Sequence, residues 1–326
     1  MKILVTGAAG FIGSHLAGRL LEEGCDVVGL DVFTAYYPAW MKTRNIARFR
    51  AHPRFRLVRG DLNDLPLGRL LRGAEAVFHL AAQAGVRSSW GRNFRTYLRH
   101  NIAATQRLLE AAKTGGGPKI VYASSSSVYG QTPDMPMTEE SPVRPLSPYG
   151  VTKLAAEQLC SLYFRNYGLP TISLRFFTVY GPGQRPDMAF HKFFKAVLDG
   201  AEIPVFGDGR QTRDFTYVDD IVEACLSALL KGRAGEVYNI GGGHRERLDR
   251  LFPLIESVTG ERLRIRRLEK QKGDVPDTHA AIAKAGRDLG YRPQSSLRDG
   301  LAAEWEDIRS LYPRSRRRSA SERTRP

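Results

Sequence analysis

The sequence predicts an α/β protein with a doubly wound parallel sheet and a smaller C-terminal α/β domain for substrate binding. Three observations lead to this fold class: six short apolar runs recur through the first half, amphipathic helix-like segments separate them, and a glycine cluster follows the first run. Strands buried on both faces are nearly continuous apolar runs, and strand–helix alternation is typical of right-handed crossovers. At 326 residues the chain is long enough for both domains.

The predicted elements alternate regularly up to residue 176. Helices are expected at 10–24, 93–115 and 147–168, where apolar residues recur with helical spacing. The strands expected between them, each rich in Val, Ile, Leu or Phe, are KILVTG, CDVVGLD, FRLVRGD, EAVFHLA, KIVYASS and TISLRFF.

The alternation breaks after residue 176. The stretch 177–187, FTVYGPGQRPD, is rich in glycine and proline and is predicted to be a long functional loop. Residues 177–312 are expected to form mainly the substrate domain, with segments from about 214–240 returning to the sheet, and 313–326 to be a disordered basic tail. Further helices are predicted at 189–200, 217–232 and 248–260, and short strands at PVFG, EVYNIG and LRIRRLE.

Charge and composition predict residence in the cytoplasm. The formal net charge is +15, and the tail contributes six arginines against one glutamate. The remaining basic chain suits an anionic small molecule as well as nucleic acid, but no aromatic-and-basic module favours nucleic acid. No apolar run approaches the roughly 20 residues that span a membrane, and no signal peptide is visible. The three cysteines form no CxxC pair or metal-ligand cluster, so we expect reduced thiols and no metal.

A dinucleotide site is predicted where the first strand meets the first helix. Gly7, Gly10 and Gly13 would allow a tight turn and let backbone N–H groups approach a pyrophosphate. Phe11 and Ile12 open the helix whose positive end would hold that pyrophosphate. The position between strand and helix makes this glycine pattern far more specific than the spacing alone.

Asp31 ends the second strand, about 20 residues past the glycine loop, where a carboxylate can accept hydrogen bonds from a ribose diol. No arginine follows immediately to bind a 2′-phosphate, so NAD is favoured over NADP. Residues 1–176 are therefore predicted to be a Rossmann-type NAD-binding domain. At the same edge of the sheet, five more residues are predicted to contact the cofactor: Asp61, Leu62, Leu80, Ala81 and Ala82.

Tyr149 and Lys153 form the predicted catalytic pair. Their i, i+4 spacing at the start of a helix places both side chains on one face. A free tyrosine, with a pKa of about 10, is a poor base at neutral pH. We expect the lysine ammonium and a positively charged nicotinamide to lower the phenol pKa, so that the tyrosine accepts a hydroxyl proton while both side chains contact the cofactor.

Four serines end the fifth predicted strand, where this fold presents catalytic groups. Ser125 is predicted to be the catalytic member, since its hydroxyl can donate to a sugar oxygen and accept from the tyrosine. Ser124 is expected to hold backbone or cofactor, and Ser126 and Ser127 to line the substrate pocket. The register along the tract is open by one residue.

At this point the sequence resembles the extended short-chain dehydrogenase/reductases, in their nucleotide-sugar epimerase and dehydratase branch. The motifs that carry the resemblance are GAAGFIG, Gly60-Asp61, HLAAQ, SSSSVYG, YGVTK, LRFFTVYGP and GDGRQTRDFTYVDD, which together extend over nearly all of 1–310. The resemblance implies a firmly held NAD, a hexose on a nucleoside diphosphate, a homodimer, and a cofactor contact by Asn101.

Two segments, HLAAQAGVR and GPGQRPDM, are similar to UDP-glucuronate 4-epimerases. This similarity implies that Arg185 holds the carboxylate of the sugar and that Arg87 lies at the substrate. An arginine suits this task because its planar fork pairs bidentately with a carboxylate. The resemblance also implies nucleoside-diphosphate contacts from Thr178 and Arg213, and a ribose contact from Asp274.

The serine tract favours one reaction. The related 4,6-dehydratases carry Asp-Glu where this chain has Ser126-Ser127, and the decarboxylases carry a glutamate in place of Ser127. With hydroxyls alone, a 4-keto sugar is expected to take its hydride back on the opposite face, which is 4-epimerisation of UDP-glucuronate. The alternatives are a UDP-glucose or UDP-N-acetylglucosamine 4-epimerase, a dehydratase or decarboxylase, and a non-catalytic NAD-binding protein whose tail binds nucleic acid.

Overall fold

The computed structural model describes residues 1–113, 117–132, 134–243, 245–269, 273 and 275–313. Its main sheet contains seven parallel strands: β1 (Lys2–Thr6), β2 (Asp26–Asp31), β3 (Phe55–Arg59), β4 (Ala76–His79), β5 (Lys119–Ser125), β6 (Thr171–Phe176) and β10 (Val237–Ile240). Their spatial order is β10-β6-β5-β4-β1-β2-β3. The strand order therefore reverses between β1 and β4, and the predicted doubly wound fold is confirmed. In such a sheet, a crevice opens outside the carboxyl ends of the strands at the reversal.

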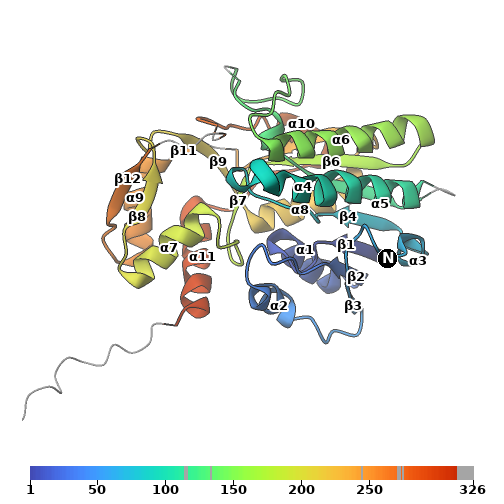
Figure 1. The fold of residues 1–326 in the computed structure, drawn as a ribbon, viewed down its shortest axis with the longest axis horizontal. Coiled ribbons are helices and arrows are strands. Elements are labelled where there is room, and N and C mark those ends of the chain that lie inside the picture. Colours follow the sequence, from blue (N-terminus) through green and yellow to red (C-terminus); the bar gives the residue numbers. More distant parts are fainter. Residues whose placement is uncertain (114–116, 133, 244, 270–272, 274, 314–326) are drawn as a thin grey trace, which may run out of the picture.

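Helices cover both faces of this sheet (Figure 1). One apolar core joins the sheet to α1 (Phe11–Glu22), α2 (Ala39–Ala47), α8 (Val218–Lys231) and α10 (Ala283–Leu289), through side chains such as Leu16 and Ile221. The second core joins the opposite face to α3 (Leu67–Leu71), α5 (Ala104–Ala112) and α6 (Pro148–Tyr167), through Leu108 and Ala156.

The helix predicted at 93–115 contains an irregularity. It begins as α4 (Phe94–Tyr97), passes through a π-helical turn, η3 (Leu98–Ala103), and continues as α5. Positions 114 and 115 lie outside the described residues. Such π-turns are frequent at functional sites, and this one carries Asn101.

Helix α6, which carries Tyr149 and Lys153, has clear boundary signals. The Ser147 side chain accepts a hydrogen bond from the Gly150 amide, Pro148 occupies the first turn, and Gly168 ends the helix with φ of 67°. A serine cap satisfies an orphan N–H, proline pre-sets the first helical φ, and glycine adopts the left-handed end without strain. The start of α6 is thus fixed at the sheet edge.

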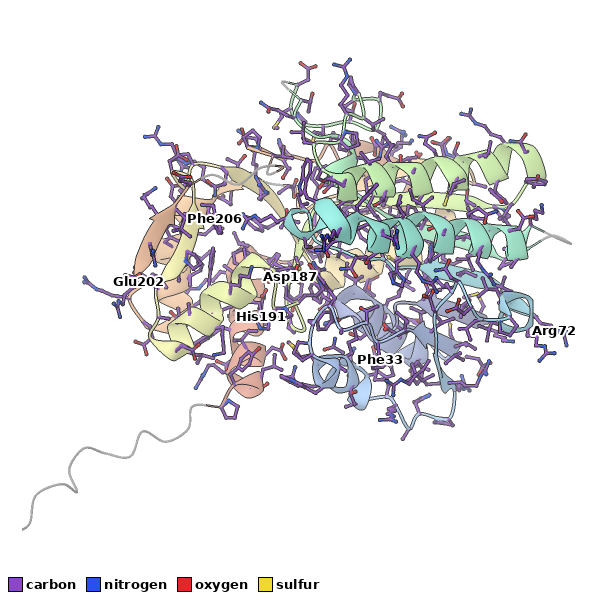
Figure 2. The ribbon with its side chains drawn as sticks, viewed as in Figure 1. Phe33, Arg72, Asp187, His191, Glu202 and Phe206 are labelled. Atoms are coloured by element: carbon purple, nitrogen blue, oxygen red, sulfur yellow. The ribbon has the colours of Figure 1, made fainter. Side chains whose placement is uncertain are left out.

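The C-terminal part builds a smaller lobe around its own core, which includes Phe190, Phe194 and Trp305. Figure 2 labels Phe206 within this lobe and Asp187 at its junction with the main sheet. Segment β10 lies in the main sheet and α8 packs against α1, while the division at residue 176 stays a prediction. The elements of this lobe are β7 (Thr178–Tyr180), β8 (Ile203–Phe206), β9 (Thr212–Tyr217), β11 (Arg245–Arg247), β12 (Ile265–Leu268), α7 (Ala189–Asp199), α9 (Leu248–Thr259) and α11 (Leu297–Leu311).

Several of these elements escape the sequence patterns. The predicted loop 177–187 contains β7, a three-residue strand that pairs with β9. Neither α2 nor α11 was predicted, although α11 contributes Leu301 and Ile308 to the smaller core. Within the described residues, no helix is long and apolar enough to cross a membrane, and no cluster of His, Cys, Asp or Glu could hold a metal ion. Beyond Pro313, the predicted tail lies outside these residues.

Candidate active site

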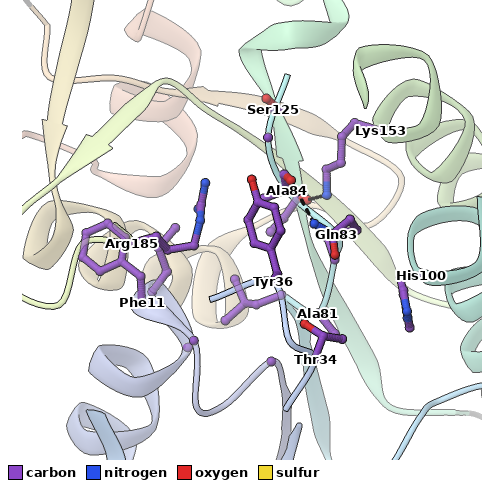
Figure 3. Close-up of a pocket in the computed structure, with 18 of the residues that line it drawn as sticks. Phe11, Thr34, Tyr36, Ala81, Gln83, Ala84, His100, Ser125, Lys153 and Arg185 are labelled. Carbon is purple, nitrogen blue, oxygen red and sulfur yellow. Dashed lines mark hydrogen bonds between the residues drawn. The ribbon is translucent and has the colours of Figure 1, made fainter. Parts of the chain in front are cut away.

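A cavity of about 450 Å³ opens along the carboxyl edge of the main sheet. Side chains from both lobes surround it in Figure 3, where Arg185 and Lys153 face it from opposite sides. The predicted site residues that line it are Gly7, Gly10, Phe11, Ile12, Gly13, Asp31, Asp61, Leu62, Leu80, Ala81, Ala82, Ser124, Ser125, Ser126, Ser127, Tyr149, Lys153, Thr178 and Arg185.

The glycine turn at one end of the cavity is shaped for close approach by a dinucleotide. Gly7 has φ of 72°, and a Cβ on Gly13 would lie 2.1 Å from the Gly7 carbonyl oxygen. Gly10 precedes the first turn of α1, whose residues line the cavity, and the N-terminus of a helix is suited to a phosphate. The backbone cradle, the adjoining Ala81 and the carboxylate of Asp31 therefore fit NAD.

Asp31 is held rigidly at the end of β2. Its Oδ2 accepts from the Ala9 amide at 3.2 Å, and its Oδ1 accepts from the Phe33 amide at 2.8 Å. Lys42 from α2 also donates to Oδ1 at 3.1 Å, in an ion pair whose side chains are both under 10% exposed. The sequence patterns missed Lys42, because its contact depends on how α2 folds back over β2.

We expect Asp31→Ser to weaken retention of NAD and to allow NADP to bind. The variant removes the carboxylate that would repel a 2′-phosphate, and it leaves two cations nearby: Lys42, and Arg59, the cross-strand neighbour of Asp31 in β3. The nucleotide released from denatured protein after incubation with equal NAD and NADP measures this change. Asp26→Asn, at the exposed start of the same strand, is the control and should keep NAD; an Asp31→Ser protein as selective as the parent would contradict the expectation.

Tyr149, Ser125 and Lys153 all line the same cavity. Interaction with the Ser125 hydroxyl lowers the pKa of the Tyr149 phenol, so these two side chains lie near each other. The Lys153 ammonium donates to the carbonyl oxygen of Ala123 and lies 4.4 Å from the ring centroid of Tyr122. The carbonyl of β5 therefore fixes where the ammonium sits, which the helical spacing of the pair did not reveal.

The pKa values depart from the expected pattern at the phenol. Burial raises the pKa of Tyr149 above its usual value, while interaction with the Ser125 hydroxyl and the charge of Arg185 partly oppose this rise. Burial also lowers the pKa of Lys153 to about 7. The expectation that Lys153 lowers the phenol pKa is thus not met by the chain alone, because burial is the largest influence on the phenol and the groups that chiefly oppose it are Ser125 and Arg185.

We expect Lys153→Met to stabilise the protein most at low pH. The pKa of Lys153 is about 7 in the folded chain and about 10.4 when unfolded, so the parent gains stability as the pH rises from 7 toward 10. Below pH 7 the burial penalty is fully present, and methionine removes it. Melting temperatures should show a larger gain over the parent at pH 6 than at pH 10. An equal gain at both pH values, or the same pattern in the exposed control Lys192→Met, would contradict this.

Ser124 and Ser125 have different hydrogen-bond partners. Ser124 donates to Glu157 at 2.6 Å, and Glu157 in turn forms a buried ion pair with Arg175 at 2.7 Å. The Ser124 hydroxyl is thus hydrogen-bonded within the core behind the cavity. Ser125 accepts from the Ser127 amide at 3.2 Å and also reaches Tyr149. Of the two serines, Ser125 is the one whose hydroxyl interacts with Tyr149, and its catalytic role stays a prediction.

Arg185 reaches the cavity from the loop that follows β7. Its guanidinium pairs with Asp187 through two hydrogen bonds of 2.9 and 3.1 Å. Tyr36 donates to the same carboxylate at 3.1 Å. The sequence patterns assigned no role to Asp187 or Tyr36, though Asp187 stands two residues after the predicted arginine and could have been considered as its partner.

Three other predicted site residues, Asn101, Arg87 and Arg213, are not among the described residues that line this cavity. Asn101 donates to the Gln83 carbonyl at 3.0 Å and to the Thr152 hydroxyl at 2.9 Å, so its side chain braces two segments of the site wall. The Arg87 guanidinium lies 4.1 Å from the ring centroid of Phe206 in the smaller lobe. Asp274 lies outside the described residues. Their assignments stay predictions.

Arg213 lies in an adjoining cavity of about 230 Å³, which shares Ser126, Ser127 and Thr178 with the larger one. This smaller cavity extends the site past the serine tract toward Gly273. The two cavities together offer room for an elongated ligand with its middle at the serines.

Comparisons with known proteins identify relatives along nearly the whole chain. Residues 3–241 match the model of the NAD dependent epimerase/dehydratase family. A Bacillus subtilis (strain 168) protein named uncharacterized UDP-glucose epimerase YtcB is 46% identical over 314 residues, covering 96% of this chain and 99% of that protein. UDP-glucuronate 4-epimerase 6 of Arabidopsis thaliana is 41% identical over 323 residues, covering 92% of this chain and 70% of that protein. A crystal structure of UDP-glucuronic acid 4-epimerase from Bacillus cereus, in complex with UDP-glucuronic acid and NAD, has a TM-score of 0.93 and 46% identity, covering 96% of this chain and 100% of that one.

Proposed function

Because the chain belongs to the NAD-dependent epimerase/dehydratase family, we propose that it inverts C4 of UDP-glucuronate to give UDP-galacturonate through a transient 4-keto sugar. The family predicted from the sequence motifs is confirmed. The observation that carries the choice of substrate is the cavity that Arg185 shares with Tyr149 and Ser125, since a cation beside the reacting centre suits a sugar acid.

The acidic groups at the cavity favour epimerisation over elimination. Among the described residues that line it, the carboxylates are Asp31, Asp61 and Asp187. Asp31 and Asp61 lie on the nucleotide side, and Asp187 is committed to Arg185 and Tyr36. Loss of water would need a carboxyl group available for proton transfer beside the ketone, and the serine tract supplies hydroxyls there instead.

The chain's own groups handle the proton of the reaction. Bound NAD supplies the acceptor and donor for the hydride at C4. The positive charge of bound NAD⁺ would favour the phenolate of Tyr149 against the effect of burial. Tyr149 would then take the proton of the 4-hydroxyl as the C4 carbonyl forms, and Ser125, which lines the same cavity, would hold that oxygen by a hydrogen bond. After the sugar turns its other face, Tyr149 returns the proton to the oxygen. The glycine turn, Asp31 and Lys42 would hold the cofactor at the other end of the cavity.

The carboxylate requires restraint during this cycle. A 4-keto glucuronate is a β-keto acid and loses CO₂ readily when its C5–C6 bond lies parallel to the π-orbitals of the ketone. Arg185 can hold the carboxylate through its outer N–H groups while Asp187 occupies its Nε edge. Such contacts would keep the C5–C6 bond from aligning with the π-orbitals of the ketone.

Product analysis of the purified protein tests the proposal. The protein is incubated with UDP-glucuronate, UDP-glucose and UDP-N-acetylglucosamine separately, with no NAD added, and nucleotide released from denatured protein identifies the cofactor. We expect UDP-galacturonate from UDP-glucuronate without CO₂. Inertness toward uronic-acid nucleotides would remove the proposal.

A second candidate is 4-epimerisation of UDP-glucose. It is favoured by the ion pair with Asp187, which neutralises much of the charge of Arg185, and by the name of the Bacillus subtilis relative. Comparison of kcat/KM for UDP-glucose and UDP-glucuronate separates the two. A larger value for UDP-glucose would make the neutral sugar the substrate.

We also propose that the protein is a cytoplasmic homodimer. All three cysteines are buried and unpaired, as expected in a reducing compartment. Large apolar side chains lie exposed on α6 and on the π-turn η3, which contacts α6. They would pack against a second copy: Leu98, Val151, Leu162 and Tyr167. Sedimentation should give twice the 36.4 kDa mass of the chain, and a monomer with full activity would contradict the dimer.

A further inference from the structure

The loop that carries Arg185 is held by carboxyl groups from the last helix of the described chain. The Gly181 amide donates to Glu304 Oε2 at 2.7 Å. The Gly183 amide donates to Asp307 Oδ2 at 2.8 Å. Glu304 and Asp307 lie one turn apart on α11, so one face of this helix holds the loop at two successive points. Arg185 follows two residues after the second point.

A carboxyl side chain is energetically unfavourable at the buried position of Glu304. It has no exposed surface, and its Oε1 has no hydrogen-bond partner among the described residues. Burial raises the pKa of Glu304 well above its usual range. Burying a carboxyl group with an unsatisfied oxygen is unfavourable, and an apolar side chain of similar volume would pack beside Leu301 and Ile308 at less cost. Core packing alone therefore does not account for a carboxyl group here.

Other elements complete the hold on the same loop. His15 of α1 hydrogen-bonds the Pro182 carbonyl at 2.8 Å. His191 of α7 hydrogen-bonds the Gln184 carbonyl at 2.8 Å. Arg44 of α2 donates to Asp307 at 2.7 Å and ties α11 to the nucleotide-binding half. The backbone before Arg185 is thus fixed by both lobes, and α11 supplies the two carboxyl acceptors.

We propose that Glu304 and Asp307 are positioning residues that fix the Arg185 loop and thereby suppress decarboxylation of the keto intermediate. The proposal rests on the proposed function, because it needs a uronic-acid substrate. When the loop moves, the C5–C6 bond can align with the π-orbitals of the C4 ketone. This bond then breaks and CO₂ leaves. The electron pair of the broken bond forms the enolate of the ketone, and C5 takes up a proton. The product is a UDP-4-ketopentose, and its departure leaves the bound nucleotide reduced.

The test compares two substitutions that differ in one acceptor. Glu304→Leu removes the acceptor of the Gly181 amide, whereas Glu304→Gln keeps a carbonyl oxygen for it. We measure CO₂ and UDP-4-ketopentose per epimer formed, the rise in absorbance of reduced nucleotide, and the melting temperature. Because misplacement by about 1 Å can change rates by about 100-fold, we expect Glu304→Leu to raise the CO₂ fraction at least tenfold. Glu304→Gln should restore the parent's product ratio.

Ile308→Ala is the matched control, since Ile308 is equally buried on the same helix but has no hydrogen bond to the loop. If Glu304→Leu does not fold, Asp307→Ala against Asp307→Asn repeats the comparison at the Gly183 amide. If the parent epimerises UDP-glucuronate, two results overturn the inference. One is a CO₂ fraction in Glu304→Leu equal to that of the parent. The other is a CO₂ fraction in Glu304→Gln or Ile308→Ala that rises as much as in Glu304→Leu. A parent that does not convert UDP-glucuronate overturns the proposed function, and this inference with it.

Discussion

Tyr149→Phe is expected to lower kcat for epimerisation by about 10²- to 10⁴-fold, the usual contribution of a positioned acid–base group. The substitution removes the phenol oxygen that exchanges a proton with the 4-hydroxyl and leaves the ring in place. UDP-glucuronate and the cofactor should still bind, because their other contacts in the cavity remain. Turnover measured beside substrate affinity gives the split between kcat and KM.

Tyr97→Phe is the control for this prediction. Its ring packs edge-on against Tyr149 at 6.2 Å between centroids, but its hydroxyl is used by Ser88 and the backbone of Ala84. We expect it to retain most of the parent's turnover. Inversion at C4 that continues at the parent's rate in Tyr149→Phe would mean that another group moves the proton.

The second large effect is expected at Arg185. Arg185→Ala should lower kcat/KM for UDP-glucuronate by about 10- to 100-fold, which matches the 1.5–3 kcal/mol of hydrogen bonds to a charged group, and should divert part of the remaining turnover to CO₂. UDP-glucose, which has no carboxylate, should lose far less. Arg185→Lys should restore little, because an ammonium cannot form the planar double contact with Asp187 and a sugar acid together.

These effects are separated by measuring both substrates and CO₂ in each variant. Arg210→Ala, at an exposed arginine of the same lobe, should behave as the parent. Equal losses on UDP-glucose and UDP-glucuronate in Arg185→Ala would show that the arginine does not recognise the carboxylate.

The main sheet could be predicted because its evidence is local. Central strands such as KILVT of β1 and AVFH of β4 are buried along almost their whole length and are therefore mainly apolar, and glycine follows the first strand where the chain must turn tightly. The three-residue strand β7 carries too short a pattern to distinguish it from the loop that follows. Helix α11 has amphipathic spacing, but no motif drew attention to it.

The parts of the site that depend on distant contacts could not be predicted. Lys42 reaches Asp31 through the path of α2, and Glu304 meets Gly181 from 123 residues away. Helical spacing correctly indicated that Tyr149 and Lys153 share a face, but it could not show that Ala123 binds the ammonium. Pairing of side chains with backbone carbonyls is set by tertiary packing, which leaves little trace in local sequence.

The most direct test of the proposed reaction uses UDP-glucuronate labelled with deuterium at C4, incubated with the purified protein and no added nucleotide. We expect UDP-galacturonate that keeps the deuterium at C4, because the hydrogen that leaves this carbon is the one that returns. Product that carries solvent hydrogen at C4, or a decarboxylated product in place of the epimer, would contradict inversion through a held 4-keto sugar.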